Sequence, residues 1–206
     1  HDEVDGVGSD VENSKAHAWM LPVLSLRAAS PPARAYAGRM QEITIRRATT
    51  HDIVGISELI QPLVDRNVLL RKELVTLYEA VQEFRVALDE RGRLVGCGAL
   101  HVLWRDLGEV RTIATADSVR GTGVGHVILD RLMADARHLG LERLFCLTFE
   151  TSFFERHGFV VVGEQIVDAE TYEMMRRSPD EGVAEFLDLA HVKPNTLGNT
   201  RMLKVL

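Results

Sequence analysis

The sequence predicts a mixed α/β domain, and three observations carry the prediction. Short runs that alternate apolar and polar residues interchange with amphipathic helical segments from Gln41 onward. A turn signal, Asp89–Gly92, joins two of the predicted strands as a hairpin. A glycine-rich stretch, Arg120–Gly125, follows one strand-like run and precedes a helix. Hairpins among these elements indicate a mixed sheet flanked by helices rather than a pure βαβ array.

The first half of the domain is expected to hold three strands and two helices. Ile43–Arg46 alternates as a strand, and Thr49 or Thr50 can cap a helix that Pro62 ends. A second helix carries apolar residues with the spacing i, i+3, i+4 and i+7. These residues are Leu74, Leu77, Tyr78 and Val81. The two strands of the hairpin are Phe84–Leu88 and Leu94–Leu103.

The second half alternates strands and helices up to a less regular C-terminal part. After the strand Glu109–Ala116, an amphipathic helix is expected to end at Gly140. Its inward-facing residues are Val124, Val127, Ile128, Leu132 and Ala136. The elements that follow are a strand at Arg143–Phe149, a short helix at Ser152–His157, a strand at Phe159–Val162, a helix at Glu170–Arg177 and a strand at Val183–Leu189.

Composition describes a globular protein and excludes several functions. The 206 residues are 46% hydrophobic and 26% charged, enough apolar material for one core. The net charge of −6, without a Lys/Arg-rich block, predicts no nucleic-acid binding. No apolar run reaches the length of a membrane span, so no membrane association is expected. Cys97 and Cys146 lie far apart without metal-ligand spacing, which suits a reducing cytoplasm and predicts neither a disulfide nor a structural zinc site.

Residues 1–40 differ from the rest and are expected to form a poorly ordered extension ahead of one domain at 41–206. The first twelve residues are acidic, and Ser30-Pro31-Pro32 is typical of a linker. The apolar stretch Ala16–Leu26 resembles the core of a signal peptide, but its flank is acidic where a signal peptide is basic.

Arg120-Gly121-Thr122-Gly123-Val124-Gly125 is the strongest local signal for ligand binding. Its glycines permit positive φ angles, and the helix N-terminus behind them presents backbone amides to an anion such as a pyrophosphate. Plain turn geometry is the commoner explanation of a lone glycine turn. A Rossmann site is disfavoured because His126 stands where the third glycine of that motif would fall, and no Walker lysine follows.

This loop and a second motif resemble the signatures of the GCN5-related N-acetyltransferase (GNAT) family. The family's acyl-CoA loop reads Arg/Gln-x-x-Gly-x-Gly/Ala, which Arg120–Gly125 matches. The second signature, an aromatic pair, three residues and Gly-Phe, is matched by Phe153–Phe159. The resemblance covers Ile43 to Leu206. It implies a mixed, mostly antiparallel central sheet flanked by helices, with splayed strands that hold the acyl-CoA.

Further stretches resemble the acetyltransferase domain of glutamate N-acetyltransferases of arginine biosynthesis. They are Gly96–Leu100, Gly108–Glu109 and Leu144–Thr148, and Arg71–Phe159 as a whole is similar to the short bacterial form. The resemblance implies acetyl-CoA as co-substrate without a metal, glutamate or glutamine as acceptor and a cytoplasmic enzyme, and it allows a homodimer. The kinase-like domain of the long form has no counterpart here, which leaves arginine feedback open.

The resemblance also implies roles for individual residues. Backbone groups of Ile113, Ala114 and Thr115 are expected to pair with the pantetheine arm. Main-chain amides are expected to hold the pyrophosphate over the positions Arg120, Gly121, Thr122, Gly123, Val124, Gly125 and His126. Arginine binds planar carboxylates in a bidentate manner, and the basic candidates for the acceptor are Arg71, Arg111, Lys193 and Arg201.

Glu109 is the expected general base, which removes a proton from the acceptor amine. Strand periodicity puts Glu109, Arg111 and Ile113 on one face, so the alternative is a rim carboxylate paired with Arg111. His101 and His126 are fallback bases. The family commonly has a tyrosine as the acid for the departing thiolate, but Phe154 stands at that position.

Two other functions compete with glutamate acetylation. One is an acetyltransferase for another small amine or a peptide N-terminus, and the other is a non-catalytic acyl-CoA-binding sensor. Glu109 and the set of arginines favour catalysis, whereas Phe154 favours the sensor.

Overall fold

The computed structural model describes residues 42–163, 166–187 and 198–206. Within them, seven strands form one sheet in the order β1-β2-β3-β4-β5-β7-β6. All neighbouring strands are antiparallel except β4 and β5. The mixed, mostly antiparallel sheet is therefore confirmed. The strands are β1 Thr44–Arg47, β2 Phe84–Leu88, β3 Leu94–Val102, β4 Leu107–Thr115, β5 Arg143–Thr148, β6 Val160–Val161 and β7 Thr200–Val205.

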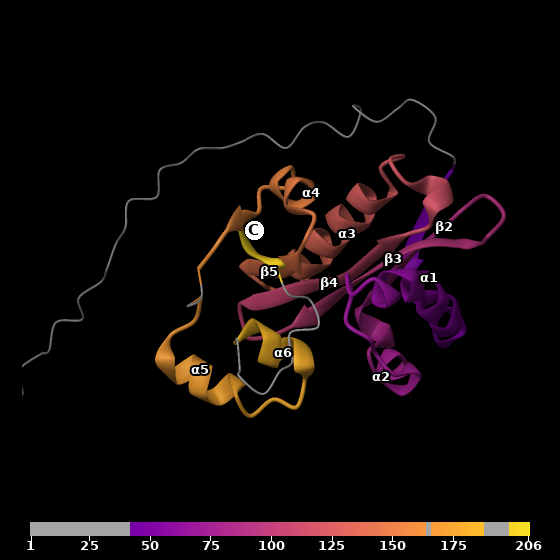
Figure 1. The fold of residues 1–206 in the computed structure, drawn as a ribbon. Coiled ribbons are helices and arrows are strands. Elements are labelled where there is room, and N and C mark those ends of the chain that lie inside the picture. Colours follow the sequence, from indigo (N-terminus) through magenta and orange to yellow (C-terminus); the bar gives the residue numbers. More distant parts are fainter. Residues whose placement is uncertain (1–41, 164–165, 188–197) are drawn as a thin grey trace, which may run out of the picture. The chain divides into compact units, whose positions relative to one another are not determined.

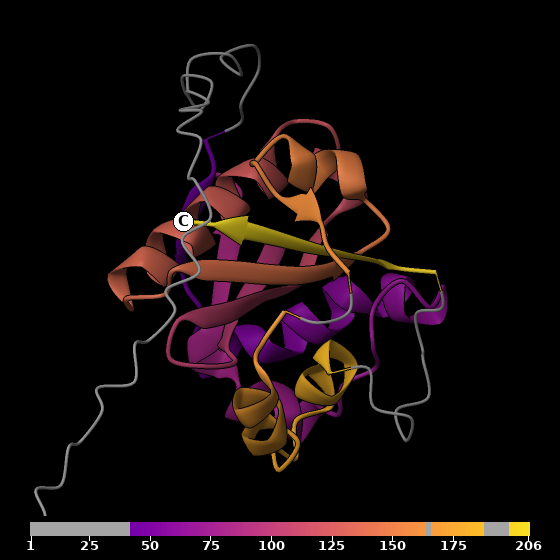
Figure 2. The ribbon, with the colours of Figure 1, turned by 90° about the vertical axis from the view of Figure 1, so that its left-hand side faces the viewer.

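Helices cover both faces of this sheet. Helices α3 and α4 lie on one face, and α1, α2, α5 and α6 lie on the other (Figures 1 and 2). The helices are α1 Ile53–Asp65, α2 Leu74–Glu79, α3 Val124–His138, α4 Thr151–Glu155, α5 Ala169–Met175 and α6 Glu181–Phe186. Three 3₁₀ segments, Thr50–Asp52, Val81–Glu83 and Asp117–Val119, precede α1, β2 and α3.

The core on the α3 side follows from the helical spacing of the α3 sequence. Val124, Ile128, Leu132 and Ala136 are buried, as the pattern predicts, whereas Val127 is 38% exposed. Two glycines of β3 let α3 approach the sheet. A Cβ atom at Gly96 or at Gly98 would lie 2.8 Å from a methyl carbon of Ile128.

The other face carries two apolar clusters. Beneath α1 and α2, Ile53, Ile56, Ile60, Leu77 and Phe84 are almost fully buried. Of the four apolar residues predicted to line the second helix, Leu77 is buried, but Leu74 and Tyr78 are exposed. Beneath α5 and α6 lies a separate cluster, which consists of Leu103, Leu107, Phe145, Val167, Met175, Val183, Phe186 and Leu187.

Two predicted elements are wrong. Helix α1 continues through Pro62 to Asp65, because burial of Ile60 and Val64 on one face outweighs the hydrogen bond that proline cannot donate. The expected strand at Val183–Leu189 is instead helix α6 as far as the chain is described there. Its buried residues Val183, Phe186 and Leu187 have the spacing i, i+3 and i+4 of a helix.

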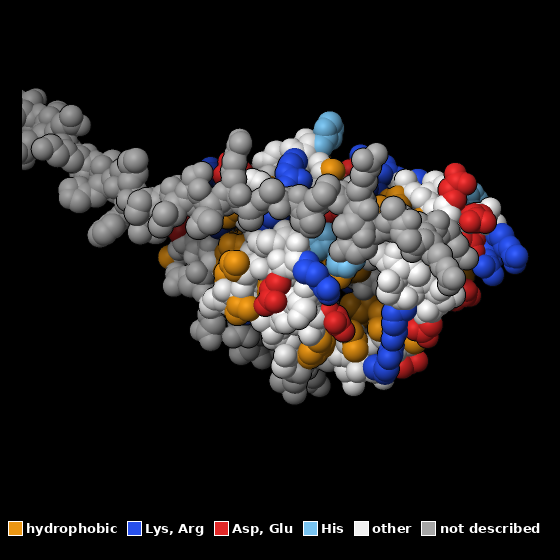
Figure 3. All heavy atoms as spheres, turned by 90° about the horizontal axis from the view of Figure 1, so that it is seen from above, with side chains coloured by type: hydrophobic (Ala, Val, Ile, Leu, Met, Phe, Trp, Pro, Cys, Tyr) orange, Lys and Arg blue, Asp and Glu red, His pale blue; other side chains and the backbone are white. Residues whose placement is uncertain are grey.

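The face that carries α3 and α4 has a mixed charge pattern. Figure 3 shows Lys and Arg side chains interspersed with Asp and Glu over its coloured area. No helix in the part of the chain that the structure describes is both long and apolar enough to cross a bilayer. Residues 1–41 lie outside the described residues, so the poorly ordered extension stays a prediction.

Candidate active site

Strands β4 and β5 separate at the centre of the sheet. They pair over three positions, from Leu107 with Arg143 to Glu109 with Phe145. Beyond Glu109, β4 continues to pair with β3 and β5 continues to pair with β7. The backbone of Ile113–Thr115, expected to bind the pantetheine arm, therefore lies where β4 has left β5. The splayed strands implied by the family resemblance are present.

An irregularity in β4 sets which side chains face the site. Thr112 has a φ angle of 58°, and the β3–β4 register shifts there by one residue. This bulge reverses the alternation of side chains. Glu109 and Arg111 lie on one face, as predicted, but Ile113 packs with the core on the α3 side. The expectation that all three share a face is wrong because strand periodicity does not anticipate a bulge.

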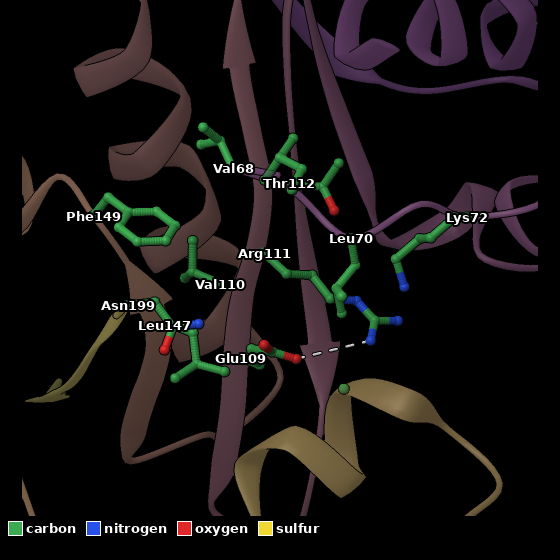
Figure 4. A pocket seen from close by; sticks show the side chains of 12 residues that line it. Val68, Leu70, Lys72, Glu109, Val110, Arg111, Thr112, Leu147, Phe149 and Asn199 are labelled. Atoms are coloured by element: carbon green, nitrogen blue, oxygen red, sulfur yellow. Dashed lines mark ion pairs between the residues drawn. The ribbon is translucent and has the colours of Figure 1, made fainter. Parts of the chain in front are cut away.

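A pocket lies over this part of β4. Its walls come from the segment after α1, from β4, from β5 and from α6 (Figure 4). The residues that line it are Val68, Leu69, Leu70, Lys72, Glu109, Val110, Arg111, Thr112, Leu147, Phe149, Gly182 and Asn199. The chemistry of the pocket thus rests on one carboxylate and two basic side chains among mainly apolar walls.

Glu109 is buried at the base of this pocket. The residue is 5% exposed, and its Oε2 atom has no hydrogen-bond partner among the described residues. Burial raises the pKa of Glu109 to about 7, against the opposing influence of the nearby Arg111, His101 and Lys72 charges. A carboxylate with a pKa near neutrality and an unsatisfied oxygen suits proton transfer at physiological pH.

Arg111 is held by acidic side chains from two other elements. It donates hydrogen bonds to Glu83 Oε2 at 2.9 Å and to Asp180 Oδ1 at 3.2 Å, while Glu109 Oε2 lies 3.8 Å from its Nη1. Although burial disfavours its charge, these three carboxylates raise the pKa of Arg111. His101 shares Glu83, with Nδ1 2.7 Å from Glu83 Oε1. Arg111 therefore binds acidic neighbours within the protein while it also lines the pocket, and its predicted contact with the acceptor stays a prediction.

The segment after α1 presents Lys72 to the pocket rather than Arg71. Arg71 does not line the pocket; its side chain is 68% exposed and lies 4.0 Å from Asp65. Lys72 lines the pocket, and Figure 4 shows its side chain on the same side as that of Arg111. Burial, and then the charge of Arg111, lower the pKa of Lys72. The sequence pointed to Arg71 instead of Lys72, because the planar guanidinium group of an arginine suits a carboxylate.

The remaining basic candidates lie elsewhere. Arg201 on β7 donates through Nη2 to the carbonyl of Phe186, at the end of α6. Its guanidinium carbon also lies 5.2 Å from the ring centre of Phe145. Arg201 thus packs beneath α6 and does not line the pocket. Lys193 lies outside the described residues.

The glycine loop has the geometry of an anion site. Gly121 and Gly123 have φ angles of 76° and 94°, which favour glycine. Gly123 is the N-cap of α3, so the first-turn amides from Val124 onward have no acceptor within the helix. Arg120 is exposed and pairs with Asp117 at 2.7 Å. The backbone of this loop, rather than its side chains, is therefore suited to hold a pyrophosphate.

The aromatic motif packs beside this loop. Phe153 lies 3.4 Å from the position of a Cβ atom on Gly125, whereas Phe154 is buried against Phe159. The position at which the family has a phenol therefore lies in the core here. His126 Nδ1 lies 2.7 Å from His157 Nε2, so this fallback base faces α4.

Comparison with known proteins identifies the same family as the sequence motifs. Residues 58–159 match the model of the acetyltransferase (GNAT) family. An amino-acid acetyltransferase from Mycobacterium tuberculosis is 57% identical over 164 residues, which cover 79% of this chain and 94% of that protein. The chain belongs to the GNAT family of acetyltransferases. The family assigned from the glycine loop and the aromatic motif is confirmed.

Other GNAT relatives are longer or more distant. An amino-acid acetyltransferase from Salmonella typhi is 33% identical over 139 residues. The match covers 65% of this GNAT chain but 31% of the Salmonella protein, so the chain spans under a third of that relative. The structure of Rv2747 from M. tuberculosis in complex with CoA and NLQ has a TM-score of 0.75 and 56% identity, covering 79% of this chain and 99% of that one. The structure of an N-acetylglutamate synthase from Neisseria gonorrhoeae has a TM-score of 0.64 and shares the fold. Its sequence is 24% identical, and the match covers 82% of this chain and 36% of the synthase chain.

Burial of Glu109 predicts that the GNAT domain loses stability as the pH rises. Because its pKa is raised from 4.5 to about 7, the native state keeps a proton that the unfolded chain has already released. The free energy of unfolding should therefore fall between pH 4.5 and 7. Glu109→Gln removes this cost, so the variant should be about 1–3 kcal/mol more stable than wild type at pH 8 and equal to it at pH 4. Urea unfolding at both pH values measures this difference in the free energy of unfolding. If the stability of the two proteins depended on pH in the same way, the prediction would be wrong.

Proposed function

We propose that the protein transfers the acetyl group of acetyl-CoA to the α-amine of L-glutamate or L-glutamine. The observation that carries this proposal is Glu109, a buried carboxylate with an unsatisfied oxygen, at the point where β4 leaves β5. Glu109 lines the pocket, and the strand that carries it is the one expected to bind the pantetheine arm. The M. tuberculosis relative named amino-acid acetyltransferase and the CoA complex of Rv2747 support the same reaction.

In this proposal Glu109 accepts the proton of the acceptor ammonium group, directly or through one water molecule. The lone pair of the freed amine then attacks the thioester carbonyl carbon, so that the C–N bond forms as the C–S bond breaks. The bond electrons leave with sulfur, the nitrogen loses its second proton as it becomes the neutral amide, and the thiolate takes up that proton directly or through water, giving the CoA thiol. A thiol with an ordinary pKa of about 8.5 is a tolerable leaving group, so the reaction does not require a phenol at position 154.

Lys72 is the proposed anchor for a carboxylate of the acceptor. It lines the pocket with Glu109, and the paired acids Glu83 and Asp180 already engage the guanidinium of Arg111. An ammonium group that binds the carboxylate beside the reacting amine would orient that amine toward the thioester. This role takes the place of the one expected for Arg71.

Lys72→Met should lower kcat/KM for the acceptor by about 10- to 100-fold, mainly through KM, because a charge-assisted hydrogen bond is lost. The matched control is Arg71→Met, whose exposed side chain should change kcat/KM by less than about twofold. Steady-state kinetics with glutamate and glutamine measure both variants. A larger loss in Arg71→Met than in Lys72→Met would return the anchor to Arg71.

Release of the CoA thiol on addition of each acceptor tests the function. Release with glutamate or glutamine, and not with a peptide, supports the proposal. Release with another amine alone would indicate a different acceptor class. Binding of acetyl-CoA without release in the presence of any amine would favour the non-catalytic sensor.

A further inference from the structure

Two arginines hold α6 at its opposite ends. At the start, Arg111 binds Asp180, whose side chain also accepts a hydrogen bond from the Val183 amide at 3.1 Å. At the end, Arg201 donates to the carbonyl of Phe186. The helix has six residues, too few to be stable by itself. Its position on the sheet therefore depends on these contacts and on the buried side chains beneath it.

The first turn of α6 lies directly against Glu109. A Cβ atom on Gly182 would lie 3.1 Å from Glu109 Oε2, 3.0 Å from Arg111 Nη1 and 2.9 Å from Asp180 Oδ1. A side chain at position 182 would therefore press on the ends of these three charged side chains, and either they or α6 would have to move. The absence of a side chain lets the segment 180–187 (the α6 segment) cover the base this closely.

Arg111 is itself fixed from the opposite side. Glu83 accepts from its Nη2 and contacts His101, which also lies 3.9 Å from Asp180. The charged groups that act on Glu109 are thus Arg111, His101, Lys72 and Asp180. Arg111 connects the 3₁₀ segment before β2, the base on β4 and the α6 segment.

We propose that Arg111 and Gly182 are positioning residues, which fix the α6 segment as a cover over Glu109 and thereby exclude water from the base. The carboxylate that Arg111 binds is then Asp180 rather than one of the acceptor. The proposal rests on the proposed function, in which Glu109 is the base. It goes further by assigning the burial of that base to a separate, displaceable helix.

Gly182→Ala disturbs the contact between the α6 segment and Glu109 without a change of charge, and we expect the added methyl group to loosen the cover. Hydration of Glu109 would lower its pKa, so the acidic limb of the kcat/KM profile should move down by about one pH unit. At pH 8, kcat/KM should fall about tenfold, because the base is weaker and less well placed. The matched control is Gly163→Ala, where no atom lies within 4 Å of the added Cβ, and its profile should equal that of wild type.

Hydrogen exchange provides a readout that does not depend on activity. Asp180→Asn keeps an acceptor for the Val183 amide but loses the charge that binds Arg111. Amides of the α6 segment should exchange about tenfold faster in this variant, while those of α3 should not change. An unchanged rate in the α6 segment would overturn the proposal, as would a wild-type acidic limb in Gly182→Ala. If the wild-type protein transferred no acetyl group, the proposed function would fail, and the exchange data would still test the contact of Arg111 with α6.

Discussion

Replacement of Glu109 by glutamine is expected to lower kcat/KM for the acceptor by about 10²- to 10⁴-fold, the usual contribution of a general base. The wild-type profile should have an acidic limb near pH 7, because burial raises the pKa of Glu109 to about that value. Below this pH the carboxylate is protonated and cannot accept the proton of the ammonium group. The variant should lack this limb. Acetyl-CoA affinity should be unchanged, since the glycine loop is a separate part of the site.

The control for this variant is Glu142→Gln, which removes a carboxylate from the exposed surface. It should leave both kcat/KM and the pH profile at their wild-type values. A Glu109→Gln enzyme with the wild-type acidic limb would show that another group is the base. His101, which shares Glu83 with Arg111, is the next group to replace in that case.

Gly125→Val is expected to weaken acetyl-CoA binding by at least about tenfold. The added side chain would enter the space beside Phe153, 3.4 Å away, and Thr115, 3.9 Å away. It would thus lie between the loop amides and the strand expected to carry the pantetheine arm. The φ angle of Gly125 is not positive, and Phe153 can shift, so the fold should be retained. Titration calorimetry measures the affinity, and a melting curve checks the fold.

Gly163→Val is the matched control, because open space surrounds that glycine. It should bind acetyl-CoA with wild-type affinity. Equal affinities in both variants would remove the pyrophosphate from the glycine loop.

The alternating strands and the amphipathic α3 could be predicted because each depends on a local pattern of apolar residues. Local patterns fail where tertiary packing decides. Helix α1 passes through Pro62 because the residues on either side are buried. The last strand, β7, was not predicted, since its place between β5 and β6 depends on pairing with residues far away in the sequence. The apolar run of α6 is short enough for a strand, although its buried residues have helical spacing, and Phe186 packs edge-on against Phe145 in the helix.

Some parts of the candidate site could likewise be predicted from the sequence, and others could not. The glycine loop and Glu109 belong to motifs that are continuous in sequence, so the family resemblance located them. Charge pairing across the fold is not visible in a sequence. The pairing of Arg111 with Glu83 and Asp180 could not be predicted, because these residues are 28 and 69 positions away along the chain. The choice between Arg71 and Lys72 depends on the direction of one loop, which no pattern of residues fixes.

The short pairing of β4 with β5 has a consequence for cooperativity. Only three residue pairs join the sub-sheet β1–β4 to the sub-sheet β5–β7–β6. An extended ligand arm that hydrogen-bonds to β4 beyond Glu109, as expected for pantetheine, would add backbone hydrogen bonds between the two sub-sheets that the chain itself does not form. The free energy of ligand binding then also stabilises the paired strands β4 and β5 against separation. With ligand at about 100 times its dissociation constant, the native state gains about 2.7 kcal/mol, as any ligand specific for the native state provides. A ligand bound along β4 is therefore expected to stabilise the two halves of the sheet against separation, in addition to the apolar core that they share.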